Sequence, residues 1–460
     1  MMYKKLIFTL IISSLFSLKL YASEGLTVVA VGEASVETDR LVIHRPYLSS
    51  SLSANQKQMA NELGDLFRNN FSFYRSKFDV REREHSSSSF PSLNRSQLKD
   101  QNVRYVLLLR ASPGSSPNSI QVEVQAHDTV GDRVFFENST TLSQANLREQ
   151  GHKLANSVYK GITGNDSIFT SRILFVSDRG SQSKRTTKEL YIMDFDGRNA
   201  EPLTNHRGIV ISPSISYDGT KVLYSLIEDE SRKDVKRNVD LYLLDLNTGK
   251  TELLSSRSGI NSGAIFMPGD DRILLTLSHT GTANIYTMDL GSRQITRLTS
   301  SHAPDVDPSI NRDGSLMTFL SGRSGAAMIY TMDPRSREDN TSNRPRRISF
   351  VGTFNATPRF NPDGTEIAFS SWMEGRFDVF RINSDGTGLA RLTRNFGSNE
   401  DPTFSPDGEF LAFSSQRVIS REEAEHNIYI MDRDGDIIGR ITHNLGNCIT
   451  PRWSRPSKLR

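Results

Sequence analysis

Two acidic groups stand on connections in the second half of the chain, and each is followed at once by a proline. One group is Asp305, Val306 and Asp307, and the other is Asn399, Glu400 and Asp401. Carboxylates placed on such connections can hold a cation or meet a basic protein surface. They can equally be solvated turn residues and caps without a partner. Both interpretations remain open from the residues alone.

No motif indicates enzymatic chemistry. Ser324 lacks the G-x-S-x-G frame of a nucleophile elbow, and the nine histidines include no H-E-x-x-H pair. Residues 194–197 and 432–435 resemble fragments of a calcium loop, but they lack its alternate ligands and terminal Glu, so turn chemistry is favoured. We therefore predict no catalytic residues, no metal site and no cofactor.

Charge and cysteine content exclude further classes of protein. The 460 residues include 56 Lys and Arg against 53 Asp and Glu, a net charge of +3, which is too balanced for a nucleic-acid-binding face. The single cysteine, Cys448, excludes a disulfide framework and a zinc site built on several thiolates.

The first 22 residues have the pattern of a secretory signal peptide. Lys4 and Lys5 precede an apolar stretch over residues 6–18, and the small residue Ala22 is a plausible cleavage position. An uncleaved anchor is the alternative. Cleavage would remove Lys4, Lys5 and Lys19, so the net charge would fall from +3 to 3 − 3 = 0. We predict an exported protein without direct membrane insertion.

From residue 172 onward the chain repeats one pattern six times. An aromatic-containing strand that ends in Asp or Asn recurs at steps of 51, 44, 44, 50 and 49 residues. The copies are residues 190–194, 241–245, 285–289, 329–333, 379–383 and 428–432. Most copies also carry a proline, a short strand and an Asp-Gly pair, which is typical of a tight hairpin. The second copy departs from this with Met267, Pro268, Gly269 and Asp270.

A unit of this size holds about four strands and cannot bury both of its faces alone, so six units predict a radial β-propeller. A linear β-solenoid would have much shorter repeats. Residues 450–454 repeat the proline element at the end of the chain and should pair beside residues 173–176 to close the ring. The connections into the proline elements would then share one face, where loops commonly bind partners.

Residues 24–164 lack this period and predict a small α/β domain. Residues 53–71 favour a helix with a capping box at Ser53, and residues 145–160 favour a second helix. Strands are expected at 78–81, 103–109, 120–127 and 133–142, with a hinge at 161–166. We thus predict a signal peptide over 1–22, an α/β domain with an extended tail over 23–164, and a propeller over 165–460.

Together these features resemble the TolB family, the periplasmic component of the Tol-Pal system. The resemblance is sharpest at residues 191–197, 404–408 and 428–432 and at the join 170–177. It implies an α/β N-terminal domain followed by an all-β six-bladed β-propeller of WD40-like (PD40) repeats. It also implies a monomeric, non-enzymatic periplasmic adaptor that supports outer-membrane integrity and envelope constriction during cell division.

The resemblance implies two partners. A peptidoglycan-associated lipoprotein, Pal, would bind the propeller rim at Ile260, Asn261, Gly263, Asp305, Val306, Asp307, Asn355, Thr357, Asn399, Glu400 and Asp401. The inner-membrane protein TolA would bind the tail at Glu24, Gly25, Leu26, Thr27, Val28 and Val29. The tail could add to a partner's sheet as an edge strand, or it could be an ordinary internal strand. The alternative function is an exported propeller enzyme or glycan-binding module acting on cell-wall carbohydrate.

Overall fold

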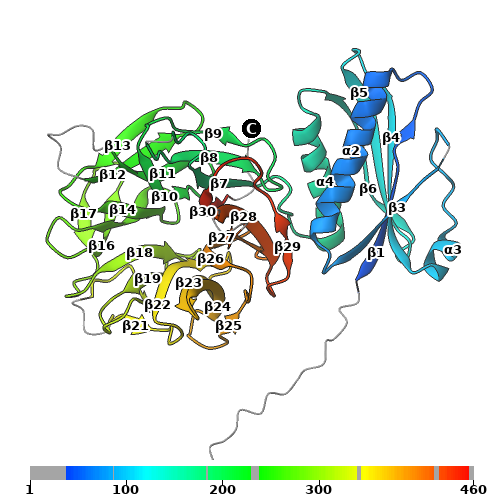
Figure 1. Cartoon of the computed structure of the whole chain (residues 1–460). Coiled ribbons are helices and arrows are strands. Elements are labelled where there is room, and N and C mark those ends of the chain that lie inside the picture. The colour runs from blue at the N-terminus through cyan, green and yellow to red at the C-terminus, as the bar shows by residue number, and fades with distance from the viewer. Residues whose placement is uncertain are drawn as a thin grey trace, which may run out of the picture.

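The computed structural model describes residues 38–85, 87–182, 185–228, 238–338, 343–418 and 424–454. The predicted signal peptide and the tail residues Glu24 to Val29 lie outside these ranges. A small α/β domain stands beside a ring of six β-sheets (Figure 1). The predicted fold class is confirmed.

The N-terminal domain is one sheet of order β3-β1-β4-β5-β6, with β2 paired to β4. Its strands are β1 (Asp39–His44), β2 (Tyr47–Leu48), β3 (Phe78–Arg83), β4 (Val103–Pro113), β5 (Ser119–Asp128) and β6 (Arg133–Ser143). Its helices are α2 (Ala54–Phe73), α3 (Arg95–Asp100) and α4 (Leu147–Thr163). Leu107 and Leu109 of β4 pack with α2 and α4, whereas Val106 and Leu108 pack with Leu98 of α3 on the other face. This is the alternation that a strand buried on both faces requires.

The helix boundaries follow from local chemistry. Ser53 and Gln56 form the capping box that the sequence predicts for α2. Helix α4 runs three residues beyond its predicted end and stops where Gly164 adopts a left-handed φ of 79°. The short helix α3, capped by Asn94, was not predicted.

Each propeller blade is a four-stranded antiparallel sheet. The first five are β10 (Ile209–Ile215) to β13 (Thr251–Ser255), β14 (Asn261–Phe266) to β17 (Ile295–Arg297), β18 (Asp305–Ile310) to β21 (Arg346–Arg347), β22 (Phe354–Phe360) to β25 (Ala390–Arg391), and β26 (Ser398–Phe404) to β29 (Ile437–Arg440). Their middle strands are β11 (Lys221–Ile227), β12 (Val239–Asp245), β15 (Arg272–Leu277), β16 (Asn284–Asp289), β19 (Met317–Ser321), β20 (Met328–Met332), β23 (Glu366–Met373), β24 (Arg376–Asn383), β27 (Phe410–Val418) and β28 (Ala424–Asp432). The second blade keeps its hairpin although its turn sequence departs from the others, and Asp270 there accepts hydrogen bonds from the backbone N–H groups of Tyr217 and Asp218.

The sixth blade takes its strands from both ends of the propeller sequence. Its order is β30 (Cys448–Trp453), β7 (Arg172–Ser177), β8 (Glu189–Asp194) and β9 (Glu201–Pro202). Strand β30 pairs antiparallel to β7, and Trp453 stands opposite Ile173. The predicted ring closure is confirmed.

The buried side chain of Trp453 stabilises the pairing of β30 with β7. Its indole is buried, and Nε1 donates a 2.8 Å hydrogen bond to Oγ of Ser171, just before β7. Ser454 Oγ accepts a hydrogen bond from the backbone N–H of Arg172. The last described residues therefore contribute both apolar burial and hydrogen bonds to the start of the propeller.

The chain's two tryptophans provide a matched test of this role. Trp453→Ala should lower the free energy of unfolding by about 3–5 kcal/mol, because a large buried side chain and its hydrogen bond are lost. Trp372→Ala, at an exposed position, should change it by less than about 1 kcal/mol. Urea denaturation followed by circular dichroism measures both, and equal effects of the two substitutions would contradict the role given to Trp453.

Candidate functional site

The propeller has two faces that its strand directions distinguish. Each innermost strand begins at one of the six predicted connections and ends near the next hairpin turn, so these features lie on opposite faces. We call the face formed by residues 208–212, 260–263, 305–307, 354–357, 399–401 and 447–450 the open face. The opposite face, which carries the Asp-Gly turns, is the turn face.

The N-terminal domain is packed on the turn face. Oη of Tyr74, at the end of α2, donates a 2.5 Å hydrogen bond to Asp407 in an Asp-Gly turn, and its ring lies 5.0 Å from that of Phe410. Phe169 and Phe195 extend the same buried cluster between the two domains. Among the described residues, this packing leaves the open face uncovered by the N-terminal domain (Figure 1).

Every innermost strand contains one residue in the left-handed region, at a shift in strand register. These residues are Ser212, Gly263, Asp307, Thr357, Asp401 and Thr450, with φ between 49° and 60°. Only Gly263 adopts such a φ without steric cost, so the other five carry backbone strain that the surrounding blades must hold. Repeated bulges of this kind redirect side chains, and here they do so around the propeller axis.

Four of the predicted rim residues are not accessible. The side chains of Asn261, Asp305, Asn355 and Asn399 are fully buried, so they are not exposed on the open face of this structure. They occupy equivalent positions, two residues before the left-handed residue in four blades. Asn261 shows their role, because its amide donates to the backbone oxygens of Val239 and Arg257 and so binds two connections together.

Asp305 also holds a connection in place, but it does so through an ion pair. It accepts a 2.9 Å ion-pair hydrogen bond from Arg323, whose guanidinium also donates to Glu338 at 2.6 Å. Burial raises the pKa of Asp305, while hydrogen bonds and the nearby Arg323 charge act in the opposite direction. The carboxylate therefore anchors a connection and is not available to a partner.

Two half-buried residues of the predicted rim, Asp307 and Asp401, lie beside arginines near the propeller axis. Asp307 accepts a 2.8 Å hydrogen bond from Arg359 of the next blade. Arg452, from the closing strand, is buried, and burial together with the charge of Arg359 lowers its pKa to about 10. Burial raises the pKa of Asp401, and the charge of Arg452 opposes this shift. We call Asp307, Arg359, Asp401 and Arg452 the axial cluster.

The remaining predicted rim residues differ in exposure. Ile260 is exposed, whereas Gly263, Val306, Thr357 and Glu400 are half-buried. Burial raises the pKa of Glu400, and the neighbouring Asp401 charge adds to the shift. Within the described ranges, no group of three or more His, Cys, Asp or Glu side chains is placed to hold a metal ion. The axial cluster is balanced in charge, so its chemistry suits recognition of a polar partner surface.

Cys448 lies inside the sixth blade, at the position equivalent to Asn399. Its thiol is fully buried, and burial raises its pKa to about 12. A thiol with so little thiolate is a poor nucleophile, so the side chain acts here as a small core residue.

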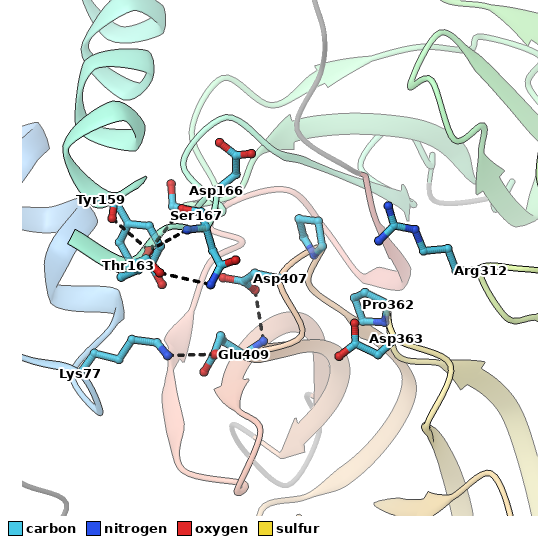
Figure 2. Close-up of a pocket in the computed structure, with 12 residues that line it drawn as sticks. Lys77, Tyr159, Thr163, Asp166, Ser167, Arg312, Pro362, Asp363, Asp407 and Glu409 are labelled. Carbon is cyan, nitrogen blue, oxygen red and sulfur yellow. Dashed lines mark hydrogen bonds and ion pairs between the residues drawn. The ribbon is translucent and has the colours of Figure 1, made fainter. Parts of the chain in front are cut away.

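A cavity of about 440 Å³ lies between the two domains on the turn face (Figure 2). Two of its acids are held by neighbouring side chains: Lys77 Nζ lies 3.0 Å from Glu409, and Asp407 accepts hydrogen bonds from Tyr74 and Ser405. Burial raises the pKa of Asp407, although those hydrogen bonds oppose the shift. The Lys77–Glu409 and Tyr74–Asp407 pairs join the two domains.

A second junction explains one of the calcium-like fragments. Arg148 of α4 donates to Asp194 at 2.9 Å and to Asp196 at 2.5 Å, so both acids bind the N-terminal domain to the propeller. Asp432 in the other fragment accepts hydrogen bonds from the backbone N–H groups of Asp434 and Asp436, as a turn residue does.

Comparisons with known proteins decide the family. The family described as "PD40: TolB beta propeller domain" matches residues 159–353 and 337–458. This chain belongs to the TolB family. "Protein TolB homolog" of Chlorobium chlorochromatii (strain CaD3) is 32% identical over 209 residues, which are 45% of this chain and 44% of that relative. "Tol-Pal system protein TolB" of Dinoroseobacter shibae is 35% identical over 163 residues, 35% of each chain.

The TolB-family chain thus matches less than half the length of these two curated relatives. The solved structure of TolB from Acinetobacter baumannii superposes with a TM-score of 0.73 at 22% identity, over 91% of this chain and 97% of that one. At that identity the likeness shows the fold alone. Among the described residues, no helix combines the length and apolar character that a membrane span requires.

Sequence reasoning overlooked the basic half of the site in this TolB-family chain. Arg359 and Arg452 both follow the proline of the repeat, after Pro358 and Pro451, so aligning the copies would have placed both near the axis. Arg148 and Tyr74 carried no such signal, because their partners are more than 40 residues away in sequence.

The junction also contains a buried histidine that predicts a pH dependence. His152 Nδ1 is 2.9 Å from Asn70 Nδ2, and burial and the charge of Arg148 lower its pKa from 6.5 to about 3, with Asp196 opposing. Below pH 6.5 the unfolded chain binds a proton there and the folded chain does not, so stability falls as pH falls. Between pH 6.5 and 5 the loss should be about 2 kcal/mol.

His152→Gln keeps an acceptor for Asn70 and cannot titrate. Its free energy of unfolding, measured by urea denaturation between pH 7.5 and 5, should vary less with pH than that of the native protein. Parallel pH profiles for the two proteins would show that His152 is not responsible.

Proposed function

We propose that this protein is a non-enzymatic periplasmic adaptor of the Tol-Pal system, which supports outer-membrane integrity and envelope constriction during division. The observation that carries the proposal is that the N-terminal domain covers the turn face and leaves the open face, with its axial cluster, free for a partner. Family membership and the printed name of the Dinoroseobacter relative support the system.

A Pal-like peptidoglycan-associated lipoprotein is the proposed partner of the open face. The residues that would contact it are Ile260, Gly263, Val306, Asp307, Thr357, Glu400 and Asp401, which are exposed or half-buried. Asn261, Asp305, Asn355 and Asn399 would act indirectly, by holding the connections in place. Rigid connections favour affinity because little conformational entropy is lost on binding.

A TolA-like inner-membrane protein is the proposed partner of the tail, at Glu24 to Val29. Polar and apolar residues do not alternate in this segment, and three of its six residues are β-branched, so addition as an edge strand suits its composition.

The proposed absence of a catalytic role is supported by the acids at the domain junction, which form ion pairs and hydrogen bonds between the domains. We propose a monomer exported by the predicted signal peptide.

The open-face acids give a direct test. In the triple variant Asp307→Asn, Glu400→Gln and Asp401→Asn, charge is removed while side-chain size is kept. Binding to the soluble domain of the Pal-like lipoprotein of the same organism should weaken at least tenfold, because opposite charges at the interface are lost. Isothermal titration calorimetry of the mature protein measures the change.

The control carries three acid-to-amide changes on the turn side of the blades: Asp245→Asn, Asp289→Asn and Asp385→Asn. Asp385 is exposed and Asp245 and Asp289 are half-buried; all three cap turns, and the amide oxygen preserves that bonding. The control should bind as the native protein does. Failure of the native protein to bind this domain would refute the proposed partner, and turnover of peptidoglycan fragments would refute the non-enzymatic role.

A further inference from the structure

The rim of one blade carries a group of aromatic side chains that the core does not use. Phe350, Phe354 and Trp372 are 75%, 44% and 39% exposed, and Phe377 is half-buried beside them. We call these four residues the aromatic rim. Within the described ranges they include every exposed large aromatic residue, and the other exposed large apolar residues are aliphatic.

The strand pairing gathers these rings on the open face. Phe354 begins β22 and stands opposite Trp372 near the end of β23, and Phe377 follows across the β23–β24 hairpin. The ring of Phe377 lies 5.0 Å from that of Trp372 and 6.1 Å from that of Phe354. Phe350 belongs to the connection that leads into Phe354. Strand β22 therefore connects the aromatic rim to the axial cluster, since Phe354 at its start is followed by Thr357 and by Arg359.

The connection itself is held rigidly. Asn355 donates a 3.1 Å hydrogen bond to the backbone oxygen of Val351, and Thr353 N–H donates to the backbone oxygen of Trp372 at 3.1 Å. Gly352 has a left-handed φ of 66°, and a Cβ there would lie 2.7 Å from the same oxygen of Trp372. The exposed rings are thus presented by an ordered loop whose conformation needs glycine.

Positive charge surrounds the rings. The Arg347 guanidinium lies 4.5 Å from the centre of the Phe350 ring, and that of Arg417 lies 4.2 Å from the Phe396 ring on the adjoining connection. Arg394, on the same connection, is exposed and has no carboxylate within ion-pair distance among the described residues. A hydrogen bond from Phe377 N–H to Ser398 joins this connection to the aromatic rim.

Two of the nearby acids, Glu374 and Asp378, are already paired. Asp378 is fully buried and lies 2.5 Å from Arg391, which also pairs with Glu374 at 2.9 Å. Arg376 reaches Glu374 at 3.5 Å. Since these two acids are held by Arg391 and Arg376, the charges of Arg347, Arg394 and Arg417 outnumber that of Glu400 on the adjoining connection.

From this arrangement we infer that the aromatic rim is the anchoring part of the open-face interface, and that its occupant is a folded protein surface presenting an apolar side chain flanked by carboxylates. The inference rests on the proposed function and names the contact within it. Aromatic and Arg side chains are those in which interface binding energy concentrates. Guanidinium groups at the edge favour carboxylates on the part of the partner that meets the aromatic rim, and the open-face acids favour positive charge on another part of it.

A double substitution tests the anchor. Phe354→Thr with Trp372→Thr removes two exposed rings and keeps a high strand propensity, so the fold should persist with an unchanged circular dichroism spectrum. Its affinity for the soluble domain of the Pal-like lipoprotein should fall at least tenfold, mainly through faster dissociation. The matched control, Leu253→Thr with Leu389→Thr, removes two exposed apolar side chains elsewhere on the propeller and should bind as the native protein does.

A charge variant tests the chemistry of the partner. Arg347→Glu with Arg394→Glu should slow association at least threefold in 50 mM salt and less in 500 mM salt, since screening weakens the interaction of exposed charges. Stopped-flow or surface plasmon resonance measurements give both rates. Association rates equal to that of the native protein at low salt would refute the acidic character of the occupant.

The outcomes separate this inference from the proposed function. If the native protein binds the Pal-like domain and the Phe354/Trp372 variant binds it equally well, the role of the aromatic rim is refuted and the proposed function is not. Absence of binding by the native protein would overturn both. Binding of isolated peptidoglycan sacculi by the native protein but not by this variant would identify the aromatic rim as a carbohydrate site and overturn the inference.

Discussion

Pairing of β30 with β7 is the contact on which the rest of the molecule depends. No blade can bury both of its faces alone, so the six sheets are stable only as a complete ring. The closing strand also supplies Thr450 and Arg452 to the axis and Trp453 to the interior. Ser171, which accepts the hydrogen bond of Trp453, stands two residues after Phe169 of the domain junction. Ring closure therefore positions the axial cluster and the N-terminal domain together.

The domain junction determines which propeller face is available. An aromatic cluster around Tyr74 and Phe169 supplies the apolar burial, and charged contacts at Arg148 and Lys77 set its orientation. Ion pairs that are partly buried are geometrically demanding, and their loss leaves a charge without compensation. Three acids in turns of the blades, Asp194, Asp196 and Asp407, bind the first domain. In the described part of the chain, the opposite side is not covered by this domain.

Repeated local chemistry made the fold predictable. The recurring strand ending in Asp, the proline and the Asp-Gly turn each act over a few residues, so their period gave the number of blades and the closing strand. Burial of Asp305 could not be read in this way, since it depends on Arg323 and Glu338 around it in space. Likewise Phe354 and Trp372 match the apolar pattern of core strands, although both side chains are exposed in the folded protein. The sequence thus predicted which residues share a face of the propeller, but not which of them are buried.

The closing strand has a consequence for the order in which the protein can fold. A chain emerges from synthesis with its N-terminus first, so β7 and five complete blades exist before Cys448 to Trp453 appear. Until then β7 has an unpaired edge, open to aggregation or to pairing with another chain. The hydrogen bond from Arg172 to Ser454 spans 282 residues, and contacts of such separation form slowly. A chain that ended before β30 would keep most of its strands yet lack the closed ring and the axial residues Thr450 and Arg452.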